Sequence, residues 1–226
     1  QAITITIGLP VALDSAFAES QSIASRAVSA LADHQVFASD VTGAHSLAVD
    51  DQTRTITLTV TRDEDGQDAD TTGSTLTATM TNGVASFTGL ALLAPVSGAY
   101  TLTYSADDLT GDRVAFSVIV GPPTALVVVQ PTSVPDVGSA NPLPVPSFTV
   151  RVVDAGGNFV ADDSPSRDLS IDTGAAVAPT AATTNGEAII TGLSVSDPVH
   201  GDLSLAVTTA DLAGTAFVIR VVTGAG

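Results

Sequence analysis

The densest group of potential ligands is an acidic segment, RDEDGQDAD, at residues 62–70. Carboxylate oxygens are the ligands that Ca²⁺ prefers, and a glycine permits the sharp turn that wraps them around an ion. The spacing is not that of an EF-hand loop and lacks its terminal glutamate. The segment therefore predicts either a calcium site, the one cofactor that the sequence suggests, or a solvated turn. The four candidate ligands are Asp63, Asp65, Asp68 and Asp70.

Other residue types that carry chemistry are few. Cysteine and lysine are absent, which excludes thiol chemistry, thiolate metal sites, lysine Schiff bases and lysine–asparagine cross-links. The three histidines, His34, His45 and His200, stand at no metal-binding spacing, so we expect them on the surface or in loops. No G-x-S-x-G nucleophile motif is present. We expect no enzymatic activity.

The charge balance limits the partners. Seven arginines face 24 acidic residues, for a net charge of −17. Binding to nucleic acid needs a basic surface, so nucleic acid is not expected as a partner. No apolar run reaches the roughly 18 residues of a membrane span, so no membrane insertion is expected. Tryptophan is absent, which disfavours a sugar platform, and the spacing of Tyr100 and Tyr104 on a strand makes them core candidates.

The segments that must position these residues have apolar side chains at every second position, which is the period of a β-strand. Apolar residues fill every second position in several short runs, as in a half-buried antiparallel strand. Glycine, asparagine, aspartate and proline separate the runs. The pattern predicts an all-β fold. Its clearest examples are TRTITLTVT (53–61), GAYTLTYSA (98–106), SFTVRVVDA (147–155) and FVIRVV (217–222).

An internal repeat predicts two domains. TNGVASFTGL (81–90) matches TNGEAIITGL (184–193) at an offset of 103 residues. Upstream, VTRDEDGQ (60–67) matches VVDAGGN (152–158) at an offset of 91, which implies an insertion in the second repeat within 170–183. Because this match aligns Asp63 with a turn that lacks the extra acids, it favours the solvated-turn interpretation.

Each repeat has room for about seven strands with turns every 8–12 residues, the pattern of an immunoglobulin-like sandwich. The predicted fold is therefore a tandem of immunoglobulin-like antiparallel β-sandwiches. The predicted domains are 11–121 and 122–226, and the run ALVVVQP should begin the second.

A third, partial copy lies at the start of the chain. AITITIGLPVAL (2–13) matches AFSVIVGPPTAL (115–126) at an offset of 113. Residues 1–10 are therefore interpreted as an N-terminal strand, either the end of a preceding domain or a strand exchanged between copies. Ile3, Ile5 and Ile7 share one face of this strand and are the predicted assembly residues, because a lone strand is not stable.

Residues 12–33 depart from the two-residue period. Ala12, Phe17, Ile23 and other apolar residues recur at spacings of three and four, and Asp14 suits an N-cap. This spacing predicts a short amphipathic helix. Two roles remain open, packing on the first sandwich or docking between subunits.

The repeat motifs carry a family resemblance. FTVRVVDAGGNFV with TTNGEAIITGL, and TLTVTRDEDGQ with TNGVASFTGL, resemble the tandem immunoglobulin-like repeats of bacterial surface proteins. Invasin-type proteins, large adhesins and filamin-like repeats share this order of turn motifs and core positions along the chain. The resemblance covers roughly residues 35–222 and implies an extracellular or cell-surface location. Because its motifs are turns and core positions, it specifies the fold better than the function.

Three functions follow from these observations. The first is a structural subunit or segment of an extracellular filament or cell-surface layer, in which copies or neighbouring domains join through β-strand contacts. The second is a spacer stalk of a large adhesin. The third is a carbohydrate-binding accessory module, which the scarcity of aromatic residues disfavours.

Overall fold

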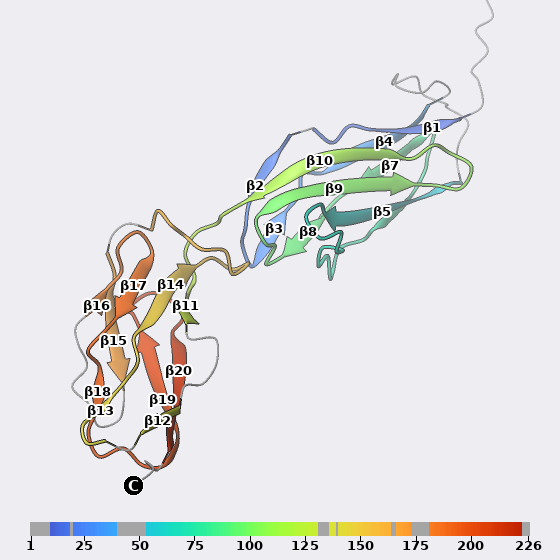
Figure 1. The fold of residues 1–226 in the computed structure, drawn as a ribbon. Helices are drawn as coiled ribbons and strands as arrows, with labels where there is room; N and C mark the ends of the chain where they lie inside the picture. Colours follow the sequence, from blue (N-terminus) through green and yellow to red (C-terminus); the bar gives the residue numbers. More distant parts are fainter. Residues whose placement is uncertain are drawn as a thin grey trace, which may run out of the picture. The chain divides into compact units, whose positions relative to one another are not determined.

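The computed structural model describes residues 10–18, 20–39, 53–130, 136–138, 140–163, 166–172 and 181–222. The chain divides into two compact units, unit 1 at Gln1–Ile119 and unit 2 at Val120–Gly226. Every regular element in the described residues is a β-strand, so the all-β prediction is confirmed (Figure 1).

Unit 1 has a three-stranded sheet ordered β1-β4-β7, a five-stranded sheet ordered β2-β10-β9-β5-β6 and a short pair, β3-β8. Neighbouring strands are antiparallel, except that β2 runs parallel to β10. The strands are β1 (Ala12–Ser15), β2 (Ser22–Ala24), β3 (Val28–Ala30), β4 (His34–Ser39), β5 (Thr55–Arg62), β6 (Thr77–Thr79), β7 (Val84–Phe87), β8 (Ala91–Leu93), β9 (Gly98–Ser105) and β10 (Asp112–Ile119).

Unit 2 repeats this plan. Its sheets are ordered β11-β14-β17 and β12-β20-β19-β15-β16, with a short pair β13-β18, and β12 runs parallel to β20. The strands are β11 (Ala125–Gln130), β12 (Asp136–Gly138), β13 (Leu143–Pro144), β14 (Phe148–Val153), β15 (Asp168–Asp172), β16 (Ala181–Ala182), β17 (Glu187–Ile190), β18 (Ser194–Val195), β19 (Gly201–Thr208) and β20 (Thr215–Val222). The run ALVVVQP does begin this unit, as β11.

Each unit has its own core, to which both of its larger sheets contribute. Along β5 exposed and buried residues alternate, as the two-residue period predicts. Val36 of β4 meets Leu58 of β5 and Leu102 of β9 in one cluster of buried side chains. Unit 2 has its own cluster, with members from β14, β15 and β19. Burying a side chain of this size stabilises the fold by about 1.5–3 kcal/mol.

The first strands of each unit serve both sheets. In unit 1 the chain pairs with β4 through β1 and then with β10 through β2. In unit 2 it pairs with β14 through β11 and then with β20 through β12. The backbone N–H of Leu13 donates to the carbonyl of Thr110 at 2.9 Å, and that of Leu126 donates to the carbonyl of Ala213 at 2.8 Å. The two units therefore begin in the same way.

The T-N-G motifs are two-residue hairpin turns, as their sequence predicts. In unit 1, Asn82 and Gly83 have φ angles of 50° and 75°. Their counterparts in unit 2, Asn185 and Gly186, have 51° and 73°. Both central residues of a type I′ turn need positive φ, which is why asparagine and glycine stand there.

The strand register corrects one part of the repeat alignment. Leu58 of β5 pairs with Tyr104, and Ile171 of β15 pairs with Val207. Ile171 follows Leu58 by 113 residues, and Val207 follows Tyr104 by 103 residues. Because these two pairs occupy the same place in the two sheets, β5 corresponds to β15. The match at offset 91 was wrong, because it aligned β5 of the five-stranded sheet with β14 of the three-stranded sheet. The chain from β15 to β19 in unit 2 is ten residues shorter than the chain from β5 to β9 in unit 1. The insertion predicted within 170–183 is therefore not present.

The helix predicted over 12–33 is also wrong. This stretch forms β1, β2 and β3, and its backbone bonds to strands far along the chain instead of to itself. Buried serine hydroxyls also bind backbone carbonyls, with Ser25 donating to Pro95 at 2.7 Å and Ser29 to Ala24 at 3.0 Å. Serine competes for backbone groups in this way and so weakens helices. The apolar residues of this stretch recur at spacings of three and four because short strands alternate with turns.

The predicted N-terminal strand, with Ile3, Ile5 and Ile7, lies outside the described residues. The described residues contain no helix of the length and apolarity that a membrane span requires.

Candidate functional site

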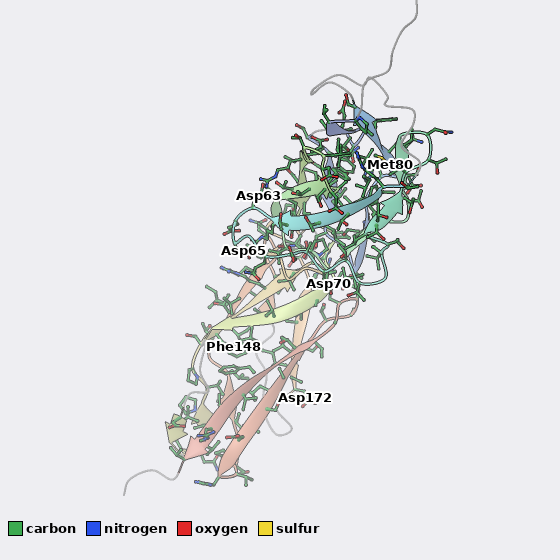
Figure 2. All side chains as sticks on the ribbon, turned by 90° about the vertical axis from the view of Figure 1, so that its right-hand side faces the viewer. Asp63, Asp65, Asp70, Met80, Phe148 and Asp172 are labelled. Atoms are coloured by element: carbon green, nitrogen blue, oxygen red, sulfur yellow. The ribbon has the colours of Figure 1, made fainter. Side chains whose placement is uncertain are left out.

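The acidic segment lies in a turn that follows β5, and Asp63, Asp65 and Asp70 each accept a hydrogen bond there. Asp63 accepts a hydrogen bond from the hydroxyl of Thr101 at 2.8 Å. Asp65 accepts from the backbone N–H of Gln67 at 3.1 Å and pairs with Nη1 of Arg62 at 3.1 Å. These bonds hold the turn in shape and leave Asp63 and Asp65 at separate places on the surface, as Figure 2 shows.

Asp70 ends the segment and is bound by the next turn. Its Oδ1 accepts from the backbone N–H of Thr72 at 3.0 Å. Hydrogen bonds from the hydroxyl and the backbone N–H of Thr72 lower the pKa of Asp70, because they favour its charged form. Asp70 is therefore anionic throughout the physiological pH range.

Three of the four aspartates line one small cavity. Its volume is about 220 Å³, and Asp65, Asp68 and Asp70 share its wall with Arg62 and Tyr100. The arginine supplies a positive charge where a cation would bind, and it already pairs with Asp65 and Glu64. Within the described residues no three carboxylates or histidines converge as metal ligands. Calcium binding by this turn stays a prediction from the sequence.

A melting experiment tests the calcium prediction. If Ca²⁺ binds this turn, calcium should raise the melting temperature of the chain, EGTA should reverse the increase, and Asp65→Ala should abolish it, because bound ligand stabilises the folded state by mass action. Asp172→Ala, which changes an exposed carboxylate of unit 2, is the matched control and should keep the response. Equal melting temperatures with and without calcium would reject the site.

The structure describes two of the three histidines and both tyrosines. His34 is buried in unit 1, so the expectation of a surface position was wrong for it, while His200 is exposed and His45 lies outside the described residues. Tyr100 and Tyr104 are buried, which confirms them as core residues. The hydroxyl of Tyr100 donates to the carbonyl of Val96 at 2.8 Å. Burial raises the pKa of Tyr104 to about 12.

The sequence did not single out Asp154, the most densely bonded carboxylate of unit 2. It is 2 % exposed and follows β14. Its oxygens accept hydrogen bonds from the backbone N–H groups of Gly156 and Asn158, at 2.9 and 3.0 Å, and from the Asn158 side-chain amide at 2.9 Å. The backbone N–H of Gly121 donates to it at 2.7 Å. Asp154 therefore ties the first residues of unit 2 to the turn after β14.

A signal for this turn was present in the sequence. The register places β4 and β14 at an offset of 114, because Leu13 pairs with Ala38 and Leu126 pairs with Val152. At that offset the D-A-G-G of 154–157 matches the D-V-T-G of 40–43, so both repeats carry D-x-x-G after the same strand. Between β15 and β16 the sequence of unit 2 contains no D-x-x-G.

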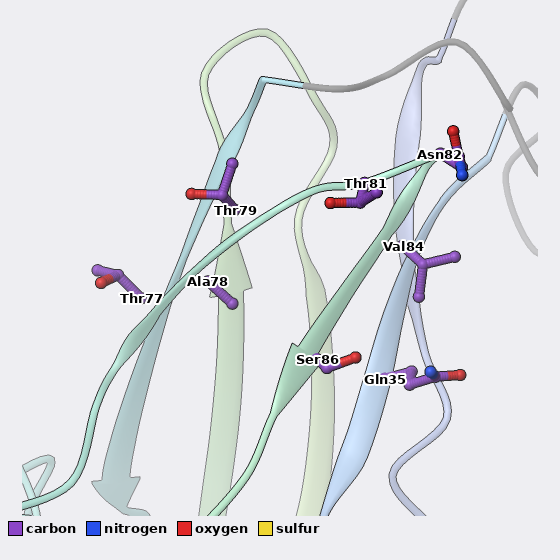
Figure 3. Close-up of a pocket in the computed structure, with 8 residues that line it drawn as sticks. All are labelled: Gln35, Thr77, Ala78, Thr79, Thr81, Asn82, Val84 and Ser86. Atoms are coloured by element: carbon purple, nitrogen blue, oxygen red, sulfur yellow. The ribbon is translucent and has the colours of Figure 1, made fainter.

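An open groove in unit 1 has a volume of about 610 Å³ (Figure 3). It lies beside β6 and β7, which stand at the ends of their respective sheets. None of its lining side chains is ionisable, so these residues supply neither an acid–base pair nor a charged ligand. They are Gln35, Thr77, Ala78, Thr79, Thr81, Asn82, Val84 and Ser86.

Comparison with known proteins gives only distant likenesses. No known protein family matches the sequence, and no curated protein does. Among solved structures, the titin tandem A164-A165 is 7 % identical, covers 96 % of this chain and 98 % of its own, and has a TM-score of 0.35. The two-domain Dpr2 Ig1-Ig2, solved in complex with DIP-Theta, is 12 % identical with a TM-score of 0.29, over 94 % of this chain and 100 % of its own.

A glycosyl hydrolase of family 2 from Bacteroides cellulosilyticus is 11 % identical with a TM-score of 0.37, and the match covers 84 % of this chain and 23 % of the hydrolase. The two tandems named above are immunoglobulin-domain proteins. Because these TM-scores and identities are low, the strand order and register described above carry the account of the fold.

Proposed function

We propose that this chain is a non-catalytic structural segment of an extracellular filament or cell-surface layer, built from two immunoglobulin-like sandwich units. The repetition of one strand plan carries the proposal. Both units use the same sheet orders, and the Leu13–Thr110 backbone bond recurs as Leu126–Ala213. Repeated units of one plan are the economical way to build length.

Three further observations support a structural role. Asp154 fixes the start of unit 2 through Gly121, so the segment between the repeats is anchored at that point. The groove beside β6 and β7 offers hydroxyls and amides without ionisable groups. The net charge of −17 favours a solvated surface, and contacts between copies must then come from uncharged segments.

The uncharged segment proposed for assembly is the N-terminal run with Ile3, Ile5 and Ile7. An extended segment can add to the edge of a sheet in a neighbouring copy, where main-chain hydrogen bonds give affinity and alternate side chains give specificity. The same chain would act as a spacer stalk if its ends joined only successive domains.

Electron microscopy of the purified chain separates these roles. We expect ordered fibres from the full chain, and loss of fibres when residues 1–10 are removed or when the three isoleucines are replaced by asparagine. Replacement of Thr4 and Thr6 by serine, on the other face of the same segment, is the control and should leave the fibres intact. A chain that stays monomeric with and without residues 1–10 would contradict assembly by strand contact and support the spacer role.

A further inference from the structure

Unit 1 has a histidine and a tyrosine hydrogen-bonded to each other inside its core. Nε2 of His34, on β4, lies 2.6 Å from the hydroxyl oxygen of Tyr104, on β9. Nδ1 of His34 lies 2.9 Å from the backbone carbonyl of Ala32. His34 is 7 % exposed and Tyr104 is 0 % exposed.

Aromatic rings enclose this pair. Phe87 of β7 stacks on His34 with the ring centres 5.7 Å apart, and Phe17 meets it edge-on at 5.0 Å. Tyr104 is also close to Phe87, at 5.8 Å. These contacts keep water away from the imidazole, and a desolvated imidazole resists protonation.

The titratable and charged groups around His34 are few. Tyr104 faces it from β9, and Asp33 precedes it on its own segment and raises its pKa slightly. On β10, Asp112 lies near Tyr104 and accepts a hydrogen bond from the backbone N–H of Ser15, on β1, at 2.8 Å. Asp14 of β1 pairs with Phe37, which alternates with the inward-facing Val36 and Ala38, so Asp14 lies on the outer face of its sheet, and Phe87 contacts His34 from β7.

The hydrogen bonds define the protonation state of the pair. A backbone carbonyl only accepts, so Nδ1 of His34 must carry the proton that it shares with Ala32. In the neutral ring Nε2 is then the acceptor, and the Tyr104 hydroxyl donates to it. Protonation of Nε2 would turn this acceptor into a donor, so the Tyr104 hydroxyl would have to rotate its own proton away from the imidazole.

Unit 2 provides an internal comparison. His34 pairs with Phe87 across β4 and β7, and Phe148 pairs with Ile190 across β14 and β17. Tyr104 corresponds in the same register to Val207. Unit 2 thus has phenylalanine, isoleucine and valine where unit 1 has histidine, phenylalanine and tyrosine, and its core has nothing to titrate at these positions.

We propose that the His34–Tyr104 pair makes unit 1 an acid-sensitive unit, which loses stability as the pH falls below about 6.5, while unit 2 has no titratable group at the corresponding core positions. The proposal does not depend on the role in a filament or stalk. In a tandem of this kind, mild acid would lower the stability of unit 1 more than that of unit 2.

The direction follows from the burial of the imidazole. Desolvation lowers the pKa of His34 below its ordinary value of 6.5. Below pH 6.5 the unfolded chain therefore binds a proton that the folded chain does not, and stability falls as the pH falls. The unfolding constant of unit 1 should rise by up to about tenfold per pH unit below 6.5 and level off once the pH is below the folded pKa.

The experiment uses urea unfolding of the full chain across this pH range. Both tyrosines lie in unit 1 and tryptophan is absent, so tyrosine fluorescence reports unit 1 alone. Wild-type unit 1 should lose stability with falling pH, and His34→Gln should flatten the profile while keeping an acceptor for Tyr104. His200→Gln, which changes an exposed histidine of unit 2, is the matched control and should leave the profile unchanged.

A second measurement keeps the proposal falsifiable if His34→Gln does not fold. The imidazole signals of wild-type chain can be titrated by NMR, and the signal of His34 should titrate below pH 6.5. A folded-state pKa of His34 at or above 6.5 would overturn the proposal. An unchanged pH profile in folded His34→Gln would overturn it as well.

Discussion

Replacing Asp154 with alanine should lower the free energy of unfolding of unit 2 by about 3 to 5 kcal/mol. The carboxylate accepts from four N–H groups, those of Gly121, Gly156 and Asn158 in the backbone and the Asn158 side-chain amide. The substitution leaves these donors without their acceptor at a site that is 2 % exposed, and each buried donor without a partner costs about 1–3 kcal/mol. Urea unfolding followed by far-ultraviolet circular dichroism measures the effect.

Asp63→Ala is the matched control. Asp63 also begins a D-x-x-G turn, but its carboxylate accepts one exposed hydrogen bond, from the hydroxyl of Thr101. Its removal should cost under about 1 kcal/mol, the usual worth of a single exposed bond. Equal losses in the two variants would show that the Asp154 carboxylate does not hold unit 2 together as described.

The second large effect is expected from a pair of core leucines. Leu102 of β9 and Leu205 of β19 occupy the same position in the two units, and both are 0 % exposed. Replacing either with alanine removes buried methyl groups and leaves a cavity, at a cost of about 2–5 kcal/mol. For units of this size that lowers the melting temperature by roughly 4–8 °C per kcal/mol.

The readout assigns each loss to one unit. Leu102→Ala should shift the unfolding curve seen by tyrosine fluorescence, because both tyrosines belong to unit 1. Unfolding of unit 2 is seen by circular dichroism but not by tyrosine fluorescence. Leu205→Ala should therefore shift the circular dichroism transition of unit 2 and leave the fluorescence transition unchanged. If Leu205→Ala moved the fluorescence transition as far as Leu102→Ala does, the two cores would not be separate.

Much of this fold could be predicted from residue patterns. The alternation in TRTITLTVT became β5, and the T-N-G motifs became hairpin turns, because both depend on local geometry. Tyr100 and Tyr104 were found in the core for the same reason, since alternate residues of a strand share one face.

The errors have a common physical origin, which is pairing between distant strands. Residues 12–33 have helical spacing, but β1 and β2 obtain their backbone partners from β4 and β10. The match of Asp63 with Asp154 compared two turns of similar composition that follow different strands. His34 was misplaced because nothing near it in sequence reveals Tyr104, its partner 70 residues away.

The shared strand plan on which the proposed role rests can be tested most directly through backbone NOEs between paired strands. The register predicts that Val207 of β19 shows cross-strand NOEs to Ile171 of β15, just as Tyr104 shows them to Leu58. The alignment at offset 91 would instead place Thr149 of β14 opposite Val207. NOEs from Val207 to Ile171 would confirm two units of one plan, and NOEs from Val207 to Thr149 would contradict it.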